Sequence, residues 1–220
     1  MTIRSRTRAA RTVPERPWSA SAREGRPDEA WKDLPEGLSG APVLGPSGHG
    51  LSCEPPTGAA APATAVVGVL AAAGCSWTLL ARLDHPERAA APPQGWLVGV
   101  AAIRLGLSLW LRDQAVARLR GRKVGGTALV YQQLVRDDLA RAATEQAMAE
   151  SLLTGPTEHS DALATVRASR HITAADRRVL RLFGASGFLS DGPGQVAYLS
   201  ELMADAYLEP VPADTKGDTR

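Results

Sequence analysis

Residues 96–122 carry the pattern that most restricts the fold of this 220-residue chain. Large apolar side chains recur there at gaps of three, four and five residues, which places them along one broad face of an α-helix. Arginine and aspartate residues fall mainly on the other faces, and Gly121, Gly125 and Gly126 then break the helix. The sequence therefore predicts a long helix with one apolar face. The apolar positions are Val100, Ile103, Leu107, Trp110, Leu111 and Val116.

Three further helical patterns follow, and short turns separate them. Gly155 helps to end the second pattern, Ser160 is a suitable N-cap for the third, and Gly184 ends the third. No strand pattern with hairpin signals occurs in the last 125 residues. We therefore predict an all-α fold, an antiparallel four-helix bundle over residues 96–209. The expected helices span 96–122, 128–153, 161–183 and 195–208.

The N-terminal part of the chain differs in composition from this bundle. Residues 1–62 are rich in Arg, Pro, Gly and Ser and have no sustained apolar period. Such a segment cannot bury enough apolar surface to offset the entropy lost on ordering, so we predict that it is largely disordered. A second disordered tail is expected at 210–220. Residues 63–95 are predicted to form an apolar segment, helical or irregular from Thr64 to Leu83, followed by a linker.

Charge and the metal-binding residue types limit the possible partners. A net charge of +2 is too small to indicate a nucleic-acid partner for the whole chain. The arginines that precede Glu15 are read as a solvated basic tail, with an organelle transit peptide as the alternative. Cys53 and Cys75 make neither a metal site nor a disulfide framework, which fits a reducing, cytoplasmic setting. His159 and His171 have no further ligand at metal-binding spacing, so no metal site is expected.

One uncharged run, from Ala65 to Ala81, requires a test for membrane insertion. A membrane-spanning helix needs about 20 predominantly apolar residues. This run is shorter, and much of it is Ala, Gly, Ser and Thr, which contribute little to insertion. We expect a buried Ala-rich helix or a remnant of another domain here, and no stable membrane insertion.

The stretch from Arg122 to Gln133 combines residue types that can bind a phosphate and a flat heterocycle. A guanidinium at a helix end offers paired donors to a phosphate and keeps its charge. The backbone N–H groups of Gly125 and Gly126 can approach a pyrophosphate closely, because neither residue has a Cβ. Gln133 can both donate to and accept from a heterocycle. The alternative interpretation is a helix-ending Arg, a two-glycine turn and a surface Gln.

From residue 97 to 210 the chain resembles the C-terminal helical domain of the acyl-CoA dehydrogenase family. The similarity rests on the 122–133 stretch and on Arg181-Leu-Phe-Gly-Ala-Ser-Gly-Phe188. In that family the Arg and the Gln of the first motif bind FAD that is held mainly by a neighbouring subunit, and the second motif lies against the FAD of the partner subunit. The resemblance therefore implies FAD-binding roles for Arg122, Gly125, Gly126, Gln133, Arg181, Gly184, Ala185 and Gly187.

Three of these positions depart from the family pattern. Gly125 stands where the family has an aromatic residue, so a stacking contact is lost. Arg181 replaces a Gln, which keeps hydrogen-bond donors but adds a charge. Ala185 replaces the second Gly of its loop and would crowd a close backbone approach.

The resemblance also implies a position for a catalytic base. The family uses one carboxylate to remove a proton beside the thioester carbonyl while a hydride leaves to the flavin. The matching residue is Glu209, although Pro210 and Val211 replace the Gly and Thr that follow it in the family. Such a carboxylate needs burial to raise its pKa towards working pH, and a solvated Glu is the alternative. The family's other location for the base falls near Trp96, which cannot serve, and Leu97 replaces an Arg found near it.

The family's N-terminal helical domain and β-sheet middle domain have no clear counterpart in this sequence. The first hypothesis is a truncated or accessory flavoprotein subunit that completes the FAD site of an acyl-CoA dehydrogenase-like chain, in a homo- or hetero-oligomer, for α,β-dehydrogenation of an acyl thioester. The alternative is a non-catalytic, degenerate relative that uses the bundle for oligomerisation or scaffolding. A third interpretation makes residues 35–95 a reduced middle domain with strands at Val66–Val69 and Trp77–Leu83. The two leading hypotheses predict association, because the bundle would leave apolar surface exposed.

Overall fold

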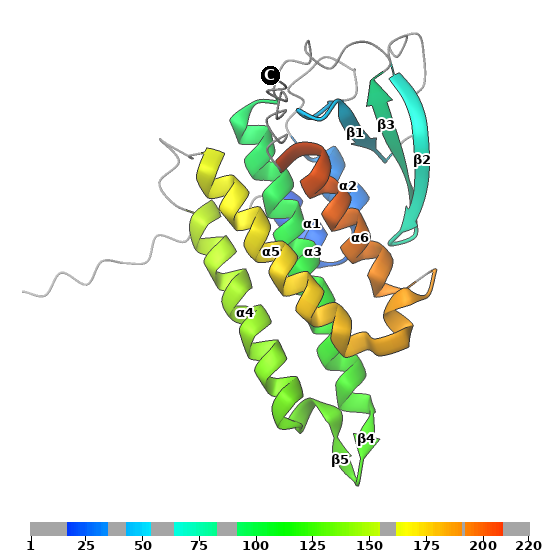
Figure 1. The fold of residues 1–220 in the computed structure, drawn as a ribbon, viewed down its shortest axis with the longest axis vertical. Helices are drawn as coiled ribbons and strands as arrows, with labels where there is room; N and C mark the ends of the chain where they lie inside the picture. Colours follow the sequence, from blue (N-terminus) through cyan, green and yellow to red (C-terminus); the bar gives the residue numbers. More distant parts are fainter. Residues whose placement is uncertain are drawn as a thin grey trace, which may run out of the picture.

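The computed structural model contains a bundle of four antiparallel helices, which confirms the predicted all-α architecture (Figure 1). α3 and α5 run in one direction, and α4 and α6 run in the other. The structure describes residues 17–34, 43–53, 64–82, 92–154, 162–190 and 192–208. The bundle helices are α3 (Gln94–Gly121), α4 (Gln133–Leu153), α5 (Ala162–Phe183) and α6 (Pro193–Met203), and a π-helical turn, η5 (Ala204–Leu208), extends α6.

α3 is the central helix, and it packs against the three other helices of the bundle. Its predicted apolar stripe is buried, except that Trp110 and Val116 are only partly covered. α3 is also the one helix of the described ranges that is long and apolar enough to cross a membrane, but 61% of its most apolar window is buried inside the protein. That burial is what the core helix of a bundle requires. The buried stripe comprises Val100, Ile103, Leu107, Leu111, Ala115 and Leu119.

Two short helices from the N-terminal part also pack on the protein. α1 (Pro17–Arg23) lies on α3, where Gly106 leaves room for it: a Cβ at Gly106 would come within 2.7 Å of the Cβ of Ala22. α2 (Pro27–Lys32) follows and also contacts α3. The prediction of disorder over 1–62 is therefore wrong for these helices, which are too short to show an apolar period. Residues 1–16, 35–42, 54–62 and the tail at 210–220 lie outside the described residues.

A three-stranded antiparallel sheet, in the order β1-β3-β2, lies beside the bundle. β2 and β3 form a hairpin whose turn residues, Ala73 and Gly74, have positive φ of 52° and 77°. The prediction of a helical or irregular segment from Thr64 to Leu83 is therefore wrong for the described residues. Alanine favours a helix, but β-branched valines, a tight turn and pairing with β1 select strands instead. The strands are β1 (His49–Ser52), β2 (Thr64–Ala72) and β3 (Cys75–Arg82).

These two strands contain the runs that the third interpretation assigns to strands. Val66–Val69 lies in β2, and Trp77–Leu83 lies in β3 as far as Arg82, which is the last described residue there. The strands of that interpretation are confirmed over these residues. Whether residues 35–95 form a reduced middle domain stays a prediction.

A short hairpin joins α3 to α4, where the sequence predicts only a glycine turn. Gly125 and Gly126 have φ of 57° and 84°, the conformation of a two-residue turn between antiparallel strands. With two residues on each side, the strands are too short to show an alternating pattern. As a result, α4 begins at Gln133 rather than at Ala128 as predicted. The connecting elements are β4 (Lys123–Val124), β5 (Thr127–Ala128) and a 3-10 turn, η2 (Leu129–Tyr131).

Candidate functional site

The first predicted FAD motif lies at an exposed end of the bundle, where the chain leaves α3. Arg122 follows the last residue of α3, and its carbonyl oxygen accepts a hydrogen bond from the Leu129 N–H at 2.8 Å. Gly125 and Gly126 form the tip of the β4–β5 hairpin, in a left-handed conformation that favours glycine. A Cβ at either glycine would meet no atom within 4 Å. The peptide groups at the hairpin tip are therefore open to approach by another molecule.

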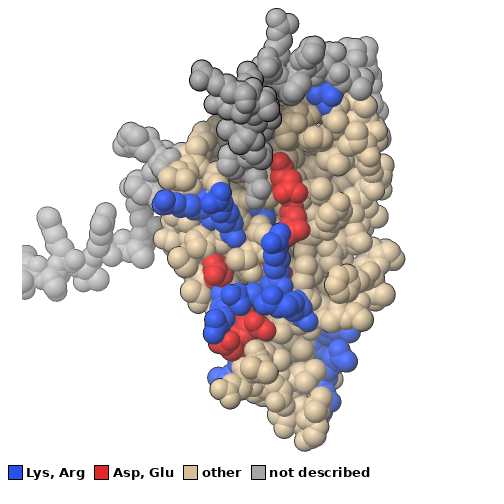
Figure 2. Space-filling model, viewed as in Figure 1, with Lys and Arg blue, Asp and Glu red and all other residues tan. Residues whose placement is uncertain are grey.

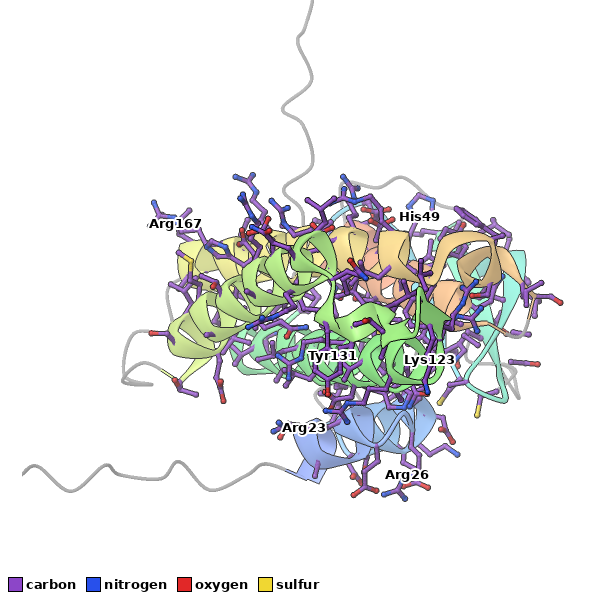
Figure 3. The ribbon with its side chains drawn as sticks, turned by 90° about the horizontal axis from the view of Figure 1, so that it is seen from below. Arg23, Arg26, His49, Lys123, Tyr131 and Arg167 are labelled. Atoms are coloured by element: carbon purple, nitrogen blue, oxygen red, sulfur yellow. The ribbon has the colours of Figure 1, made fainter. Side chains whose placement is uncertain are left out.

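The side chains around this tip are exposed and largely basic. Arg122 and Gln133 are both exposed, and neither side chain makes a hydrogen bond or ion pair with any residue that the structure describes. Lys123 lies at the same end, as Figure 3 shows, and Arg118 and Arg120 occupy the last turn of α3. These cations interact favourably with the partial negative charge at the C-terminus of the helix. The Arg122 guanidinium and the two glycine N–H groups at the tip fit a phosphate or pyrophosphate group.

The second predicted FAD motif lines a cleft between the C-terminal end of α5 and α6. Gly184 ends α5 with φ of 58° and begins a 3-10 turn, η4 (Gly184–Phe188), on which Ala185 is exposed. The cleft has a volume of about 530 Å³, and Arg181, Gly184 and Gly187 contribute to its wall. The structure therefore brings three of the four predicted residues of this motif together. The other lining residues include Leu180, Phe188, Gln195, Tyr198 and Glu201.

The hairpin and the cleft lie in the same half of the molecule. α3 and α5 run in the same direction, so the segments that follow them emerge towards the same end of the bundle (Figure 1). An ion pair connects the cleft to the helix that follows the hairpin: the Arg181 guanidinium lies 3.7 Å from Asp138 Oδ1 of α4. The two motifs are therefore presented on one end, as two separate groups of residues.

Trp96, near which the resemblance puts one location for the catalytic carboxylate, lies near the other end of the bundle. Trp96 is in the first turn of α3, and Tyr207 is near the end of η5. Their ring centroids are 4.8 Å apart, with an angle of 73° between the ring planes. Glu209 itself lies outside the described residues, so its role as the base stays a prediction. Trp96 has no group that can remove a proton.

Two further tryptophans fill the space around this pair. Trp31 of α2 lies 5.6 Å from Trp77 of β3, 5.6 Å from Trp96 and 5.9 Å from Tyr207, measured between ring centroids. Trp77 is fully buried, and Trp96 and Tyr207 are 6% and 2% exposed. We call these four residues the aromatic cluster. It packs the sheet and α2 against the bundle beside the first turn of α3.

The hydroxyl of Tyr207 fixes the cluster to β1. It donates a hydrogen bond to the Val43 carbonyl oxygen at 3.0 Å and accepts one from the Leu51 N–H at 2.6 Å. Burial raises the pKa of Tyr207, so the hydroxyl stays protonated and keeps its donor role. The end of α6 is thus held by buried hydrogen bonds to two N-terminal segments.

A buried polar network inside the bundle was not among the predicted site residues. Arg104 of α3 is fully buried. Its guanidinium donates to Ser200 Oγ of α6 at 3.1 Å, to Thr173 Oγ1 of α5 at 2.8 Å, and to the side chain of Ser169 on α5. A buried cation is tolerated when its donors are satisfied in this way.

Asp176 of α5 extends this network. Its Oδ2 accepts a hydrogen bond from Ser200 Oγ at 3.2 Å, so Ser200 connects the Arg104 guanidinium to the carboxyl group. Burial raises the pKa of Asp176 to about 6, against the opposing effects of a hydrogen bond from Ser108, the charge of Arg104 and the bond from Ser200. This carboxyl group is 1% exposed and therefore out of reach of a substrate.

Gln146 carries the network from α3 to α4. Its Nε2 donates to the Ser108 hydroxyl and carbonyl oxygens, both at 2.9 Å, and its Oε1 accepts from Arg112 at 2.6 Å. A sequence signal for this network exists: Arg104, Ser108 and Arg112 recur every four residues within the otherwise apolar stretch 96–112. Because the network joins all four helices of the bundle, we assign it a structural role.

The histidines and cysteines are the remaining side chains that could bind a metal ion. His171 of α5 makes a 2.6 Å contact between its Nδ1 and Glu145 Oε2 of α4, and His159 lies outside the described residues. Within the described ranges, no group of three His, Cys, Asp or Glu side chains could hold a metal ion. Cys53 and Cys75 are both free thiols, and burial raises the pKa of Cys75.

The acyl-CoA dehydrogenase C-terminal domain family matches residues 98–211, just over half of the chain. A structure of the electron transferring flavoprotein of Acidaminococcus fermentans is 17% identical, with a TM-score of 0.50 over 67% of this chain and 46% of that chain. Butyryl-CoA dehydrogenase from Megasphaera elsdenii is 16% identical, with a TM-score of 0.50 over 69% of this chain and 47% of that one. No curated protein sequence matches the chain.

These comparisons bear on the region that carries both predicted FAD motifs. The matched residues run from α3 to the end of α6, and the structural likeness, at this identity, shows a shared fold. The chain spans about half the length of the two similar chains.

Proposed function

The chain belongs to the acyl-CoA dehydrogenase family through its C-terminal helical domain, and we propose that it acts as an accessory flavoprotein subunit that completes the FAD site of a partner chain. The partner is an acyl-CoA dehydrogenase-like protein, either a second copy or a different chain, and the substrate is an acyl thioester. We place the subunit in the cytoplasm, to which its two free cysteines are suited.

The observation that carries this proposal is the exposed hairpin end. Arg122, Gln133 and the glycine turn are the residues that the family uses towards a neighbouring subunit's FAD, and here they are exposed and open to a partner. A free guanidinium and two unobstructed glycine N–H groups suit the pyrophosphate of the cofactor. We assign binding of that group to Arg122 and the hairpin tip, and contact with the rest of the cofactor to the cleft formed by Arg181, Gly184 and Gly187.

The aromatic cluster supports the need for a partner. Beside the first turn of α3, Trp31, Trp77, Trp96 and Tyr207 pack against one another with little exposure, except that Trp31 is partly exposed. A substrate would have to displace these rings to enter this part of the described structure, so a partner is needed to enclose it. FAD, when bound, supplies the acceptor for the hydride that leaves the β-carbon of the thioester. Glu209 remains the proposed base for the α-proton on this chain.

The same cluster favours the second candidate function, a non-catalytic relative that uses the bundle for assembly. A packed aromatic cluster offers no opening to a substrate, whereas exposed apolar residues at the hairpin end and on α4 are useful in an interface. Tyr131 and Leu134 are 68% and 82% exposed. Under this alternative, the bundle associates without flavin.

Flavin content of the assembled protein distinguishes the two functions. The full chain is purified with its bound partners from the cells that express it, and the flavin absorbance is measured per chain. We expect a yellow complex that loses most of its flavin in Arg122→Ala. Arg120→Ala is the matched control, because Arg120 is also exposed in the last turn of α3 and lies outside the motif.

Titration of the isolated chain with FAD completes the test. An accessory subunit binds FAD weakly or not at all alone, so a perturbed flavin spectrum is expected only in the complex. A colourless complex, or one whose flavin content is the same in Arg122→Ala and Arg120→Ala, contradicts the proposal and supports the assembly function.

A further inference from the structure

The sheet has two edges, and the chain covers one of them with its own groups. At the β1 edge the Leu51 N–H donates to the Tyr207 hydroxyl at 2.6 Å, and the Gly45 N–H donates to the His49 carbonyl oxygen at 2.8 Å. The segment around Gly45 and the η5 turn therefore lie along β1 and satisfy these two backbone groups. They cover the β1 edge, so a further strand cannot pair with it there.

β2 forms the opposite edge, and it is open. It pairs with β3 on one side, from Thr64 opposite Arg82 to Ala72 opposite Cys75, and no other described backbone group bonds to it. Its nine residues include no charge and no proline, which are two of the features that protect an edge strand from pairing; a third, a β-bulge, lies between Val66 and Gly68. The valines of β2 are strongly exposed: Val66 55%, Val67 55% and Val69 68%.

On the face shown in Figure 2, the surface along β2 is also largely uncharged. Figure 2 shows tan residues over the side of the molecule that β2 forms, while the Lys and Arg side chains gather over α4 and α5. A partner selected by charge would therefore be drawn to the helices rather than to the sheet. An uncharged strand can instead pair with its own copy without placing like charges opposite each other.

We propose that β2 pairs with β2 of a second copy of this chain, antiparallel about a two-fold axis at Gly68, so that two three-stranded sheets become one. This arrangement places Val67 opposite Val69 and Val66 opposite Leu70, pairs of the kind that stabilise adjacent strands. The β-bulge between Val66 and Gly68 lies at the centre of the contact. Because the β1 edges are covered, the association closes at two copies and does not continue into a fibre.

The oligomeric state of the full chain, measured by sedimentation velocity, tests this inference. We expect wild-type protein to have a mass twice that of one chain at micromolar concentration. The double substitution Val67→Lys and Val69→Lys brings like charges together across the axis and is expected to raise the dimer dissociation constant by about tenfold or more. Val124→Lys is the matched control, since Val124 is 61% exposed on the β4–β5 hairpin.

A cross-linking variant tests the register without weakening the strand. A Cβ at Gly68 lies 4.0 Å from the nearest atom, the Cβ of Leu79, so Gly68→Cys is tolerated sterically. Residues directly opposite each other in a sheet are close enough for a disulfide. Mild oxidation should convert Gly68→Cys to a covalent dimer, while wild type and Val124→Cys stay uncross-linked.

The outcomes separate this inference from the proposed function. A monomeric wild type, or a dimer that survives the double lysine substitution and does not cross-link through Gly68→Cys, overturns it. If Val124→Lys dissociates the dimer and the β2 variant does not, association runs through the hairpin end. That result overturns the β2 contact and leaves the proposed flavoprotein role standing.

Discussion

Asp176 gives the folded protein a pH dependence that can be calculated from the structure. The carboxyl group is 1% exposed among α3, α5 and α6, and burial raises its pKa from 3.8 to about 6. The charged groups that face it are Arg104, which favours ionisation, and Glu201, which opposes it. A group whose pKa is higher in the folded state binds its proton more tightly there, so it stabilises the fold at low pH.

The magnitude follows from the shift. Each pKa unit corresponds to about 1.36 kcal/mol, so ionising Asp176 lowers the free energy of unfolding by roughly 3 kcal/mol once the pH is well above 6. The contribution is fully present below about pH 4 and is lost as the pH rises through about 6. Between about pH 4.5 and 7.5, this one group lowers the free energy of unfolding by about 2 kcal/mol.

Asp176→Asn isolates this effect, because the amide cannot ionise. Urea unfolding, followed by circular dichroism across that pH range, should show the difference in stability between Asp176→Asn and wild type changing by about 2 kcal/mol in favour of the variant as the pH rises. Asp113→Asn on α3 is the control: it is exposed and retains the Asp176 carboxyl, so it should follow wild type. Parallel pH curves for wild type and Asp176→Asn would refute the reasoning.

Two further substitutions test how the N-terminal segments are held. Tyr207→Phe leaves the Leu51 N–H without its acceptor and should lower the free energy of unfolding by about 1–3 kcal/mol in urea titrations; an unchanged midpoint would contradict this. Gly106→Ala places a Cβ 2.7 Å from that of Ala22, so α1 should shift and be cleaved faster by protease. Gly121→Ala, with no atom within 4 Å, should show wild-type cleavage; equal cleavage in both variants would refute the steric argument.

The helices of the bundle could be predicted because each carries its own signal. The stripe from Val100 to Leu119 and the glycine at the end of α5 are local features, and the structure confirms α3 and α5 close to their predicted limits. The hairpin of β2 and β3 could not be predicted in this way. Its alanine-rich composition favours a helix, and only pairing with β1 and packing of Trp77 against the bundle outweigh that preference.

The candidate site shows the same division. The residue types at Arg122, Gly125 and Gln133 suggested a phosphate-binding turn, and the structure adds that they are exposed around a hairpin tip. No local pattern indicated that Trp31, Trp77, Trp96 and Tyr207 would meet, because they come from four separate elements.

The sequence by itself determined the four helices, their order and the family to which they belong, since apolar period, caps and glycine turns act over a few residues. Only the tertiary structure determined which contacts form between separate elements. It buried Arg104 and Asp176 inside the bundle, packed four aromatic rings between the sheet, α2 and the bundle, and covered one sheet edge while leaving β2 open. Those outcomes depend on residues far apart in the chain, whose meeting is set by the packing of whole elements rather than by any local preference.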